Sequence, residues 1–188
     1  EGKSKFVIFS GGKFEFRKGQ DYVCAAMSHF MKQRDDVVLL AAWHNPWPQS
    51  VQTMSHSWLI DWQKPLENLP KERVIQVPQI RNDQTPALYA QAHIGVFASR
   101  CEAGTNLVLC EFLACGRPVV ASYCTGHLDV LTDDCPFLIR NGTYDPAQWF
   151  NVNVADLLTY LEYAYQNKDR LAELSIGFRK LVEKFTWR

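Results

Sequence analysis

The chain of 188 residues lacks several features that would place it in a common functional class. Its 20 basic and 20 acidic residues cancel to a formal net charge of zero, so no general attraction to nucleic acid or to anionic membrane is expected. No apolar run reaches the roughly 18 residues of a transmembrane helix, and the apolar core near the start is too short for a secretory signal. There is no internal repeat and no low-complexity segment. These absences favour a cytoplasmic protein.

The cysteines form no recognisable metal or disulfide framework. They lie within apolar runs, without CxxC pairs and without histidines at metal-binding spacing, which favours a reduced environment and no zinc site. The six positions are Cys24, Cys101, Cys110, Cys115, Cys124 and Cys135. The sequence Asn141-Gly142-Thr143 matches a glycosylation acceptor, but Asn-Gly favours a turn, and a turn is predicted there.

Short apolar runs alternate with amphipathic stretches along the whole chain. The predicted strands cover residues 5–10, 36–42, 73–77, 94–99, 117–122 and 136–139. The predicted helices cover residues 20–34, 86–92, a stretch beginning near 107, 127–132, 153–166 and 168–184. This alternation predicts a single α/β domain over 1–188, with a doubly wound parallel sheet of about six strands and helices on both faces. Ligands of such sheets bind beyond the carboxyl ends of the strands.

Between the second and third predicted strands lies an aromatic-rich segment. Asn45-Pro46-Trp47-Pro48 is a breaker of regular structure. Together with Trp58 and Trp62 it offers an aromatic surface for a base or sugar, although tryptophans in a domain of this size more often belong to the core or to a partner surface.

The segment "SGGKFEFRKG" (10–19) follows the first predicted strand. Gly11 and Gly12 would let the backbone approach a ligand closely, and Lys13, Arg17 and Lys18 suit a phosphate. The segment matches neither the GxGxxG fingerprint nor the P-loop. A glycine turn flanked by solvated lysines is the alternative interpretation.

The segment "RCEAGTNLVLCEFLACGRPVV" (100–120) places Glu111 among apolar residues of a predicted helix. Such a carboxylate is expected to be buried, and it then needs hydroxyl donors or a buried cation; a salt bridge to a lysine or arginine at the edge of the core is the structural alternative. Small polar residues from Glu102 to Asn106 precede the helix, so backbone N–H groups and the positive helix end are available to an anion.

Taken together, "SGGKFEFRKG", "ASRCEAGTNLVLCEFLACGRPVVAS" and "TGHLDVL" resemble the C-terminal, nucleotide-sugar-binding domain of the retaining GT-B glycosyltransferases of family 4, called glycosyl transferases group 1. The resemblance runs from about residue 6 to the end. It implies a UDP-, GDP- or ADP-linked sugar as ligand and no metal or other cofactor. In agreement, Asp35-Asp36 and Asp133-Asp134 are adjacent pairs rather than a DxD motif.

The resemblance also implies roles for individual residues. Glu111 would grip the ribose hydroxyls and Glu102 the hydroxyls of the transferred sugar, although eight residues separate the two here and seven in the family. Lys18 matches the family's lysine, and Lys13 stands where the family usually has arginine, so the charge is kept without the two-pronged grip. The donor-binding residues expected in all are Gly11, Gly12, Lys13, Lys18, Arg81, Glu102, Gly104, Thr105, Asn106, Leu107 and Glu111.

Further expectations concern particular contacts and roles. Lys13 and Lys18 are expected to bind the diphosphate with the backbone N–H groups of residues 104–106, and Lys13, Lys18 and Glu102 are the expected catalytic residues. Arg81 and the backbone of residues 77–80 correspond to the region that reads the base. His127 stands at a predicted helix start, where contact with phosphate is one interpretation, but a side chain facing solvent is expected.

The resemblance further implies that an N-terminal acceptor domain of the same polypeptide and a final C-terminal helix lie outside this chain. The chain is then expected to bind nucleotide sugar without transferring it. The full enzyme would move a hexosyl group to a glycan or lipid-linked acceptor, as in bacterial polysaccharide synthesis, and peripheral association with the inner face of the membrane stays open.

Two other functions compete with this one. A GT-B epimerase or phosphorylase would need its own base, cofactor lysine or acid pair, and none is clearly placed in the sequence. A non-catalytic flavodoxin-like binding module is the other; a receiver of that kind needs acidic residues after the first strand, where this chain has Gly11-Gly12-Lys13.

Overall fold

The computed structural model describes residues 4–44 and 64–185. The aromatic segment of residues 45–48, with Trp58 and Trp62, lies outside the described residues. Within them a six-stranded parallel sheet has the strand order β3-β2-β1-β4-β5-β6, which confirms the predicted doubly wound fold. Its strands are β1 (Phe6–Lys13), β2 (Val37–His44), β3 (Val74–Gln76), β4 (Ile94–Phe97), β5 (Val119–Ser122) and β6 (Leu138–Ile139).

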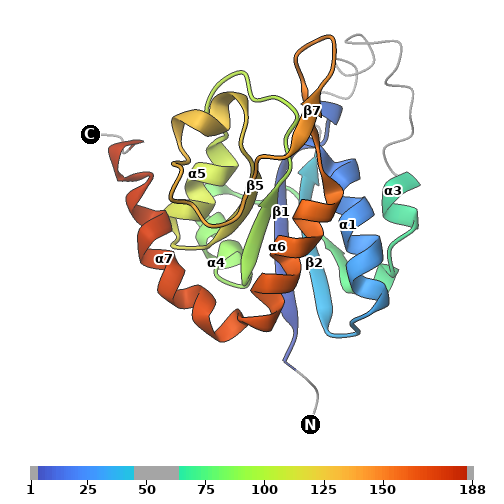
Figure 1. Cartoon of the computed structure of the whole chain (residues 1–188). Helices are drawn as coiled ribbons and strands as arrows, with labels where there is room; N and C mark the ends of the chain where they lie inside the picture. The colour runs from blue at the N-terminus through green and yellow to red at the C-terminus, as the bar shows by residue number, and fades with distance from the viewer. Residues whose placement is uncertain (1–3, 45–63, 186–188) are drawn as a thin grey trace.

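Helices cover this sheet. The α-helices are α1 (Gln20–Lys32), α3 (Lys64–Glu67), α4 (Thr85–Tyr89), α5 (Leu107–Ala114), α6 (Val154–Gln166) and α7 (Leu171–Lys180). Short 3₁₀ turns are η1 (Phe16–Lys18), η3 (Lys71–Arg73), η4 (Asn82–Gln84), η5 (Thr125–Asp129), η6 (Lys168–Arg170) and η7 (Glu183–Phe185). Figure 1 shows α1 beside α6 and α5 beside α7, and both pairs are in contact.

The central strands show why both faces of the sheet must be covered. Every residue of β4 and of β5 is buried. Because successive side chains of a strand point to opposite faces, a strand buried at every position has packing on both sides. The largest buried side chains include Phe6, Phe9 and Phe112, and Phe9 stacks on Phe112 with ring centroids 5.0 Å apart.

The predicted glycine loop begins later than expected. Gly11 and Gly12 continue β1, because they pair in parallel with Ala42 and Trp43 of β2. The backbone N–H of Phe14 still donates to the carbonyl of His44 at 2.9 Å. The turn that leaves the sheet is therefore the segment 14–19, and the prediction of a loop starting at Gly11 is wrong.

A second, small sheet was absent from the sequence-based prediction. β7 (Gly142–Tyr144) and β8 (Phe150–Val152) form an antiparallel hairpin. The turn predicted at residues 141–143 is wrong, since Gly142 and Thr143 belong to β7; the hairpin turns over residues 145–149 instead, where the Asp145 side chain accepts from the Trp149 backbone N–H at 2.9 Å.

Candidate functional site

Two loops meet at the carboxyl end of the central strands. The segment 14–19 follows β1, and the segment 98–106 follows its neighbour β4. The Arg100 backbone N–H donates to the Arg17 carbonyl at 2.7 Å. Gly19, with φ 67°, allows the close approach, because a Cβ there would lie 2.0 Å from the Ala98 carbonyl oxygen. The strand order runs outward from β1 to β2 and β3 on one side, and from β4 to β5 and β6 on the other. Ligands of doubly wound folds bind where the strand order reverses in this way.

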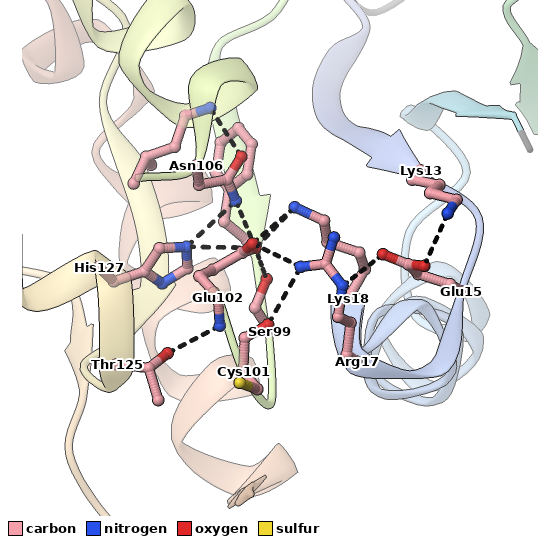
Figure 2. Close-up of polar contacts among 12 residues, drawn as sticks. Lys13, Glu15, Arg17, Lys18, Ser99, Cys101, Glu102, Asn106, Thr125 and His127 are labelled. Carbon is pink, nitrogen blue, oxygen red and sulfur yellow. Dashed lines mark hydrogen bonds and ion pairs between the residues drawn. The ribbon is translucent and has the colours of Figure 1, made fainter. Parts of the chain in front are cut away.

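Glu102 is the buried carboxylate of this edge. Its side chain is 4% exposed. Lys18 Nζ lies 2.8 Å from both carboxylate oxygens, and Arg17 Nη1 lies 2.8 Å from Oε2. Ser99 Oγ donates to Oε1 at 2.7 Å, and Figure 2 shows these donors converging on the carboxylate. The cost of burying this charge is thus offset by two cations and by hydrogen bonds.

Asn106 links this carboxylate to the start of α5 and to a buried histidine. One side-chain N–H of Asn106 donates to Glu102 Oε1 at 2.9 Å, and His127 Nε2 lies 3.1 Å from the same Nδ2. The Asn106 carbonyl oxygen caps α5 by accepting from the Leu109 N–H at 3.3 Å. His127 Nδ1 donates to the Ser122 carbonyl at 2.8 Å, which leaves Nε2 as the acceptor for Asn106.

The prediction that His127 faces solvent is wrong. Its side chain is completely buried, because the 3₁₀ turn η5 directs it inward, beside the Glu102 carboxylate (Figure 2). Burial lowers the pKa of His127 below its ordinary value, and Lys18 acts in the same direction. A neutral ring with its proton on Nδ1 fits this hydrogen-bond pattern.

Lys18 and Glu102 each stabilise the charged form of the other. Burial lowers the pKa of Lys18, and the adjacent Glu102 carboxylate opposes much of that effect. Burial would raise the pKa of Glu102, but Lys18 and the Ser99 hydroxyl more than compensate, so its pKa lies below the usual value. Glu102 is therefore ionised at neutral pH, and Lys18 is its main counter-charge.

A second acid extends the charged cluster toward the sheet. Glu15 Oε1 lies 2.5 Å from Arg17 Nε, and Glu15 Oε2 lies 3.3 Å from Lys13 Nζ. Cations and carboxylates thus alternate in a connected series across the two loops (Figure 2). In space the order is Lys13, Glu15, Arg17, Glu102 and Lys18. Arg17 brings a guanidinium beside Lys18. The sequence indicated Arg17 as a cation suited to phosphate, but it was not among the expected donor-binding residues.

Beside this cluster lies a cavity of about 510 Å³. Lys13 and Gly12 line it from β1, and Glu111 lines it from α5, together with Leu107 and Val108. Residues 77–80, the segment that the resemblance associates with the base, also line it, together with Thr85, Leu88 and Tyr89. Two of the predicted site residues, Lys13 and Glu111, are thereby brought to one cavity although 97 residues of sequence separate them.

Glu111 differs from its prediction in one respect. It is an exposed residue on the cavity wall rather than a buried one, because α5 turns this position away from the core that Phe112 and Leu113 enter. Within the described residues it forms no ion pair with a lysine or arginine. Its recorded partner is the Tyr89 hydroxyl, which donates to Oε2 at 2.7 Å.

Of the remaining predicted donor-binding residues, Gly104, Thr105 and Gly11 lie near the cavity or the Glu102 cluster, and Arg81 does not. Gly104 is exposed and Thr105 half-buried in the loop ahead of α5, and neither backbone N–H forms a hydrogen bond to another described residue. Gly11 lies behind the cavity, where a Cβ would meet Phe9 at 2.4 Å. Arg81 is not brought to the cavity: it is exposed and pairs with Asp83 at 2.8 Å.

Two other functional features are missing from residues 4–44 and 64–185. No group of three or more histidine, cysteine, aspartate or glutamate side chains there is arranged to hold a metal ion. No helix in that part of the chain has the length and apolar character to cross a bilayer. All six cysteines carry free thiols.

Comparisons with known proteins agree with the geometry. The model of the family described as Glycosyl transferases group 1 matches residues 4–159. A D-inositol 3-phosphate glycosyltransferase from Xylanimonas cellulosilytica is 27% identical over 185 residues, which is 98% of this chain and 39% of the relative. The chain therefore spans about two fifths of the length of that curated relative.

Solved structures support the same fold. The C-terminal domain of a glycosyl transferase group 1 family protein from Francisella tularensis matches with a TM-score of 0.70 at 17% identity, covering 96% of this chain and 86% of that one. HepE from Anabaena, in complex with UDP and glucose, matches with a TM-score of 0.70 at 17% identity, covering 96% and 44% of the two chains. Since the family model covers well over half of the residues, the chain belongs to the glycosyl transferases group 1, and its fold is that of the C-terminal GT-B domain.

Proposed function

We propose that this chain is the donor-binding domain of a retaining, metal-independent glycosyltransferase and that it binds a nucleoside diphosphate sugar. The observation that carries the proposal is the shared cavity of Lys13 and Glu111. Gly12, which also lines this cavity, lies against the Lys18 side chain, and Lys18 and Arg17 both pair with Glu102. An ammonium and a carboxylate on one cavity suit the two polar parts of such a ligand, its diphosphate and its ribose diol.

The ligand is proposed to lie across the cavity with its base toward residues 77–80. Glu111 then accepts from the ribose hydroxyls. The diphosphate lies toward Lys13 and Lys18, with the backbone N–H groups of Gly104 and Thr105 at the α5 end as further donors. A close pair of opposite charges contributes about 4 kcal/mol at an effective dielectric near 20, so two cations are enough to stabilise a departing diphosphate without a metal.

Glu102 is proposed to receive the transferred sugar. In the structure its carboxylate oxygens accept from Lys18, Arg17, Ser99 and Asn106. A diphosphate would compete with Glu102 for Lys18 and Arg17. The cations would then turn part of their hydrogen bonding to the ligand, and acceptor capacity on Glu102 would become available to sugar hydroxyls.

The acceptor is proposed to bind elsewhere in a longer polypeptide. The relative from Xylanimonas extends well beyond the region matched here, and in GT-B enzymes a second domain completes the active site. We therefore expect this chain to bind the donor and to leave transfer of the hexosyl group, to a glycan or lipid-linked acceptor, to the complete enzyme. HepE was crystallised with UDP and glucose, which makes UDP-glucose the first ligand to test.

Isothermal titration with UDP, GDP, ADP and their glucose and mannose derivatives tests the proposal and identifies the base. We expect one nucleoside diphosphate to bind at least about tenfold more tightly than the other two. Lys32→Ala, at the exposed end of α1, is the matched control and should bind as the wild type does. Absence of binding to all of these ligands would overturn the proposed function.

A further inference from the structure

Tyr89 is a buried aromatic residue that lines the cavity and carries one polar side-chain group, its hydroxyl. It ends α4 and is 3% exposed. Its ring packs edge-on against Phe9 at 5.1 Å and against Phe112 at 5.4 Å, measured between ring centroids. Because aromatic packing on two sides fixes the ring, the direction of the hydroxyl is fixed as well.

That hydroxyl donates to Glu111 Oε2 at 2.7 Å. Burial raises the pKa of Tyr89 well above the ordinary tyrosine value, and the neighbouring Glu111 carboxylate raises it further. The phenol therefore keeps its proton throughout the physiological range. Tyr89 is the donor and Glu111 the acceptor, which makes this a short hydrogen bond to a charged group.

The hydrogen bond leaves Glu111 able to bind a ligand. An ionised carboxylate has about four lone-pair positions, and Tyr89 occupies one of them on Oε2. The acceptor positions of Oε1 and the remaining one of Oε2 stay available on a residue that lines the cavity. A glutamate without this tether would sample several rotamers and lose that freedom when a ligand bound.

We propose that Tyr89 is a positioning residue that holds Glu111 in the orientation needed to accept from a ribose diol, and that it thereby makes the cavity selective for ribonucleotides over nucleotides lacking the diol. The inference rests on the proposed function, because it requires a nucleoside diphosphate in the cavity. A purely structural tether between α4 and α5 would support every ligand equally. Selectivity for the diol is what separates the two roles.

The test compares Tyr89→Phe with the wild type, using the diphosphates of uridine, guanosine and adenosine and their 2′,3′-dideoxy forms. Phenylalanine keeps the ring packing and removes the hydroxyl. For the preferred base, Tyr89→Phe should weaken binding of the ribose form by about fivefold to tenfold and change binding of the dideoxy form by less than about twofold. In a protein that already carries Glu111→Ala, adding Tyr89→Phe should not weaken binding of the ribose form further, because Tyr89 acts only through Glu111.

A second measurement covers the case in which Tyr89→Phe does not fold. 3-Fluorotyrosine placed at position 89 gives a ¹⁹F signal that should shift when the ribose form binds and stay unmoved, or shift much less, with the dideoxy form. Equal weakening of both forms by Tyr89→Phe, or equal ¹⁹F shifts with both, overturns the positioning role. Failure of the wild type to bind any diphosphate overturns the proposed function and this inference with it.

Discussion

Lys18 Nζ lies 2.8 Å from each of the two carboxylate oxygens of Glu102, although the residues belong to loops that follow different strands. Lys18 has only 10% of its side chain exposed and Glu102 has 4%. Buried ion pairs are costly to break from one side, because the remaining charge is left without a partner. Changes at either residue should therefore alter ligand binding and stability together.

Lys18→Ala should weaken binding of the preferred nucleoside diphosphate at least about tenfold, because the proposed diphosphate site loses a cation. It should also lower the melting temperature, since Glu102 loses its main counter-charge. Titration calorimetry and thermal unfolding measure the two effects, with Lys32→Ala as the control. Unchanged affinity in a folded Lys18→Ala protein would remove Lys18 from the site.

Glu102→Gln should have the opposite effect on diphosphate binding. Glutamine is nearly the same size but carries no charge, so Lys18 and Arg17 become available to the ligand. We expect the dissociation constant for the nucleoside diphosphate to fall by at least about threefold. The same titration on Glu15→Gln provides the comparison, because Glu15 forms its ion pairs with Arg17 and Lys13 rather than with Lys18. Weaker binding by Glu102→Gln would show that the carboxylate does not compete with the ligand.

Gly126→Ala should destabilise the site loops, whereas Gly104→Ala should be tolerated. A Cβ on Gly126 would lie 2.0 Å from the Gly104 carbonyl oxygen, and one on Gly104 would meet nothing within 4 Å. Overpacking of this kind costs about 1–3 kcal/mol. Urea unfolding of the two variants measures the difference in unfolding free energy. Equal stability of Gly126→Ala and the wild type would contradict the close packing of η5 on the loop ahead of α5.

The unfolding free energy should fall as the pH decreases below the ordinary histidine pKa of 6.5. The pKa of His127 is lowered in the folded state by burial, so between that lowered value and 6.5 the unfolded chain binds a proton that the folded chain does not. Stability is therefore greatest above 6.5 and is lost on acidification. His93 contributes in the same direction, because burial and Arg117 lower its pKa too.

His127→Gln isolates the contribution of His127. Its unfolding free energy, measured by urea denaturation between pH 5 and pH 7.5, should depend less steeply on pH than that of the wild type. The pH dependence of the unfolding free energy that remains in His127→Gln is expected to come from His93. His93→Gln should therefore remove part of it. An identical pH dependence in His127→Gln and the wild type would mean that His127 has the same pKa in the folded and unfolded states.

The fold could be predicted from the sequence because the strands are almost entirely apolar. Runs such as residues 37–41 and 94–97 are buried at every position, and this pattern alone indicates a parallel sheet covered on both faces. The hairpin of β7 and β8 could not be predicted in the same way. Its strands have three residues each, and β7 is exposed throughout, so it carries no alternating apolar pattern.

Part of the candidate site could also be proposed from the sequence, but from motifs rather than from apolar runs. Lys13, Lys18, Glu102 and Glu111 lie in two motifs whose spacing is visible in the sequence. Which carboxylate is buried was predicted wrongly, because an apolar neighbourhood along the chain does not fix the direction in which one helix position points: Glu111 faces the cavity and Glu102 the interior. The partner Tyr89 lies 22 residues away on another helix, and no local pattern links it to Glu111.

The hydrogen bonds of Arg17 and Lys18 to Glu102 join residues 84 and 85 positions apart in the sequence. Contacts of such long range form after the local structure on either side of them, because closing a long loop costs chain entropy. The charged cluster around Glu102 is thus absent until the segments around β1 and β4 have docked on each other. Nucleoside diphosphate binding would accordingly serve as a reporter of complete refolding, appearing later than helix content does when the chain is diluted from denaturant.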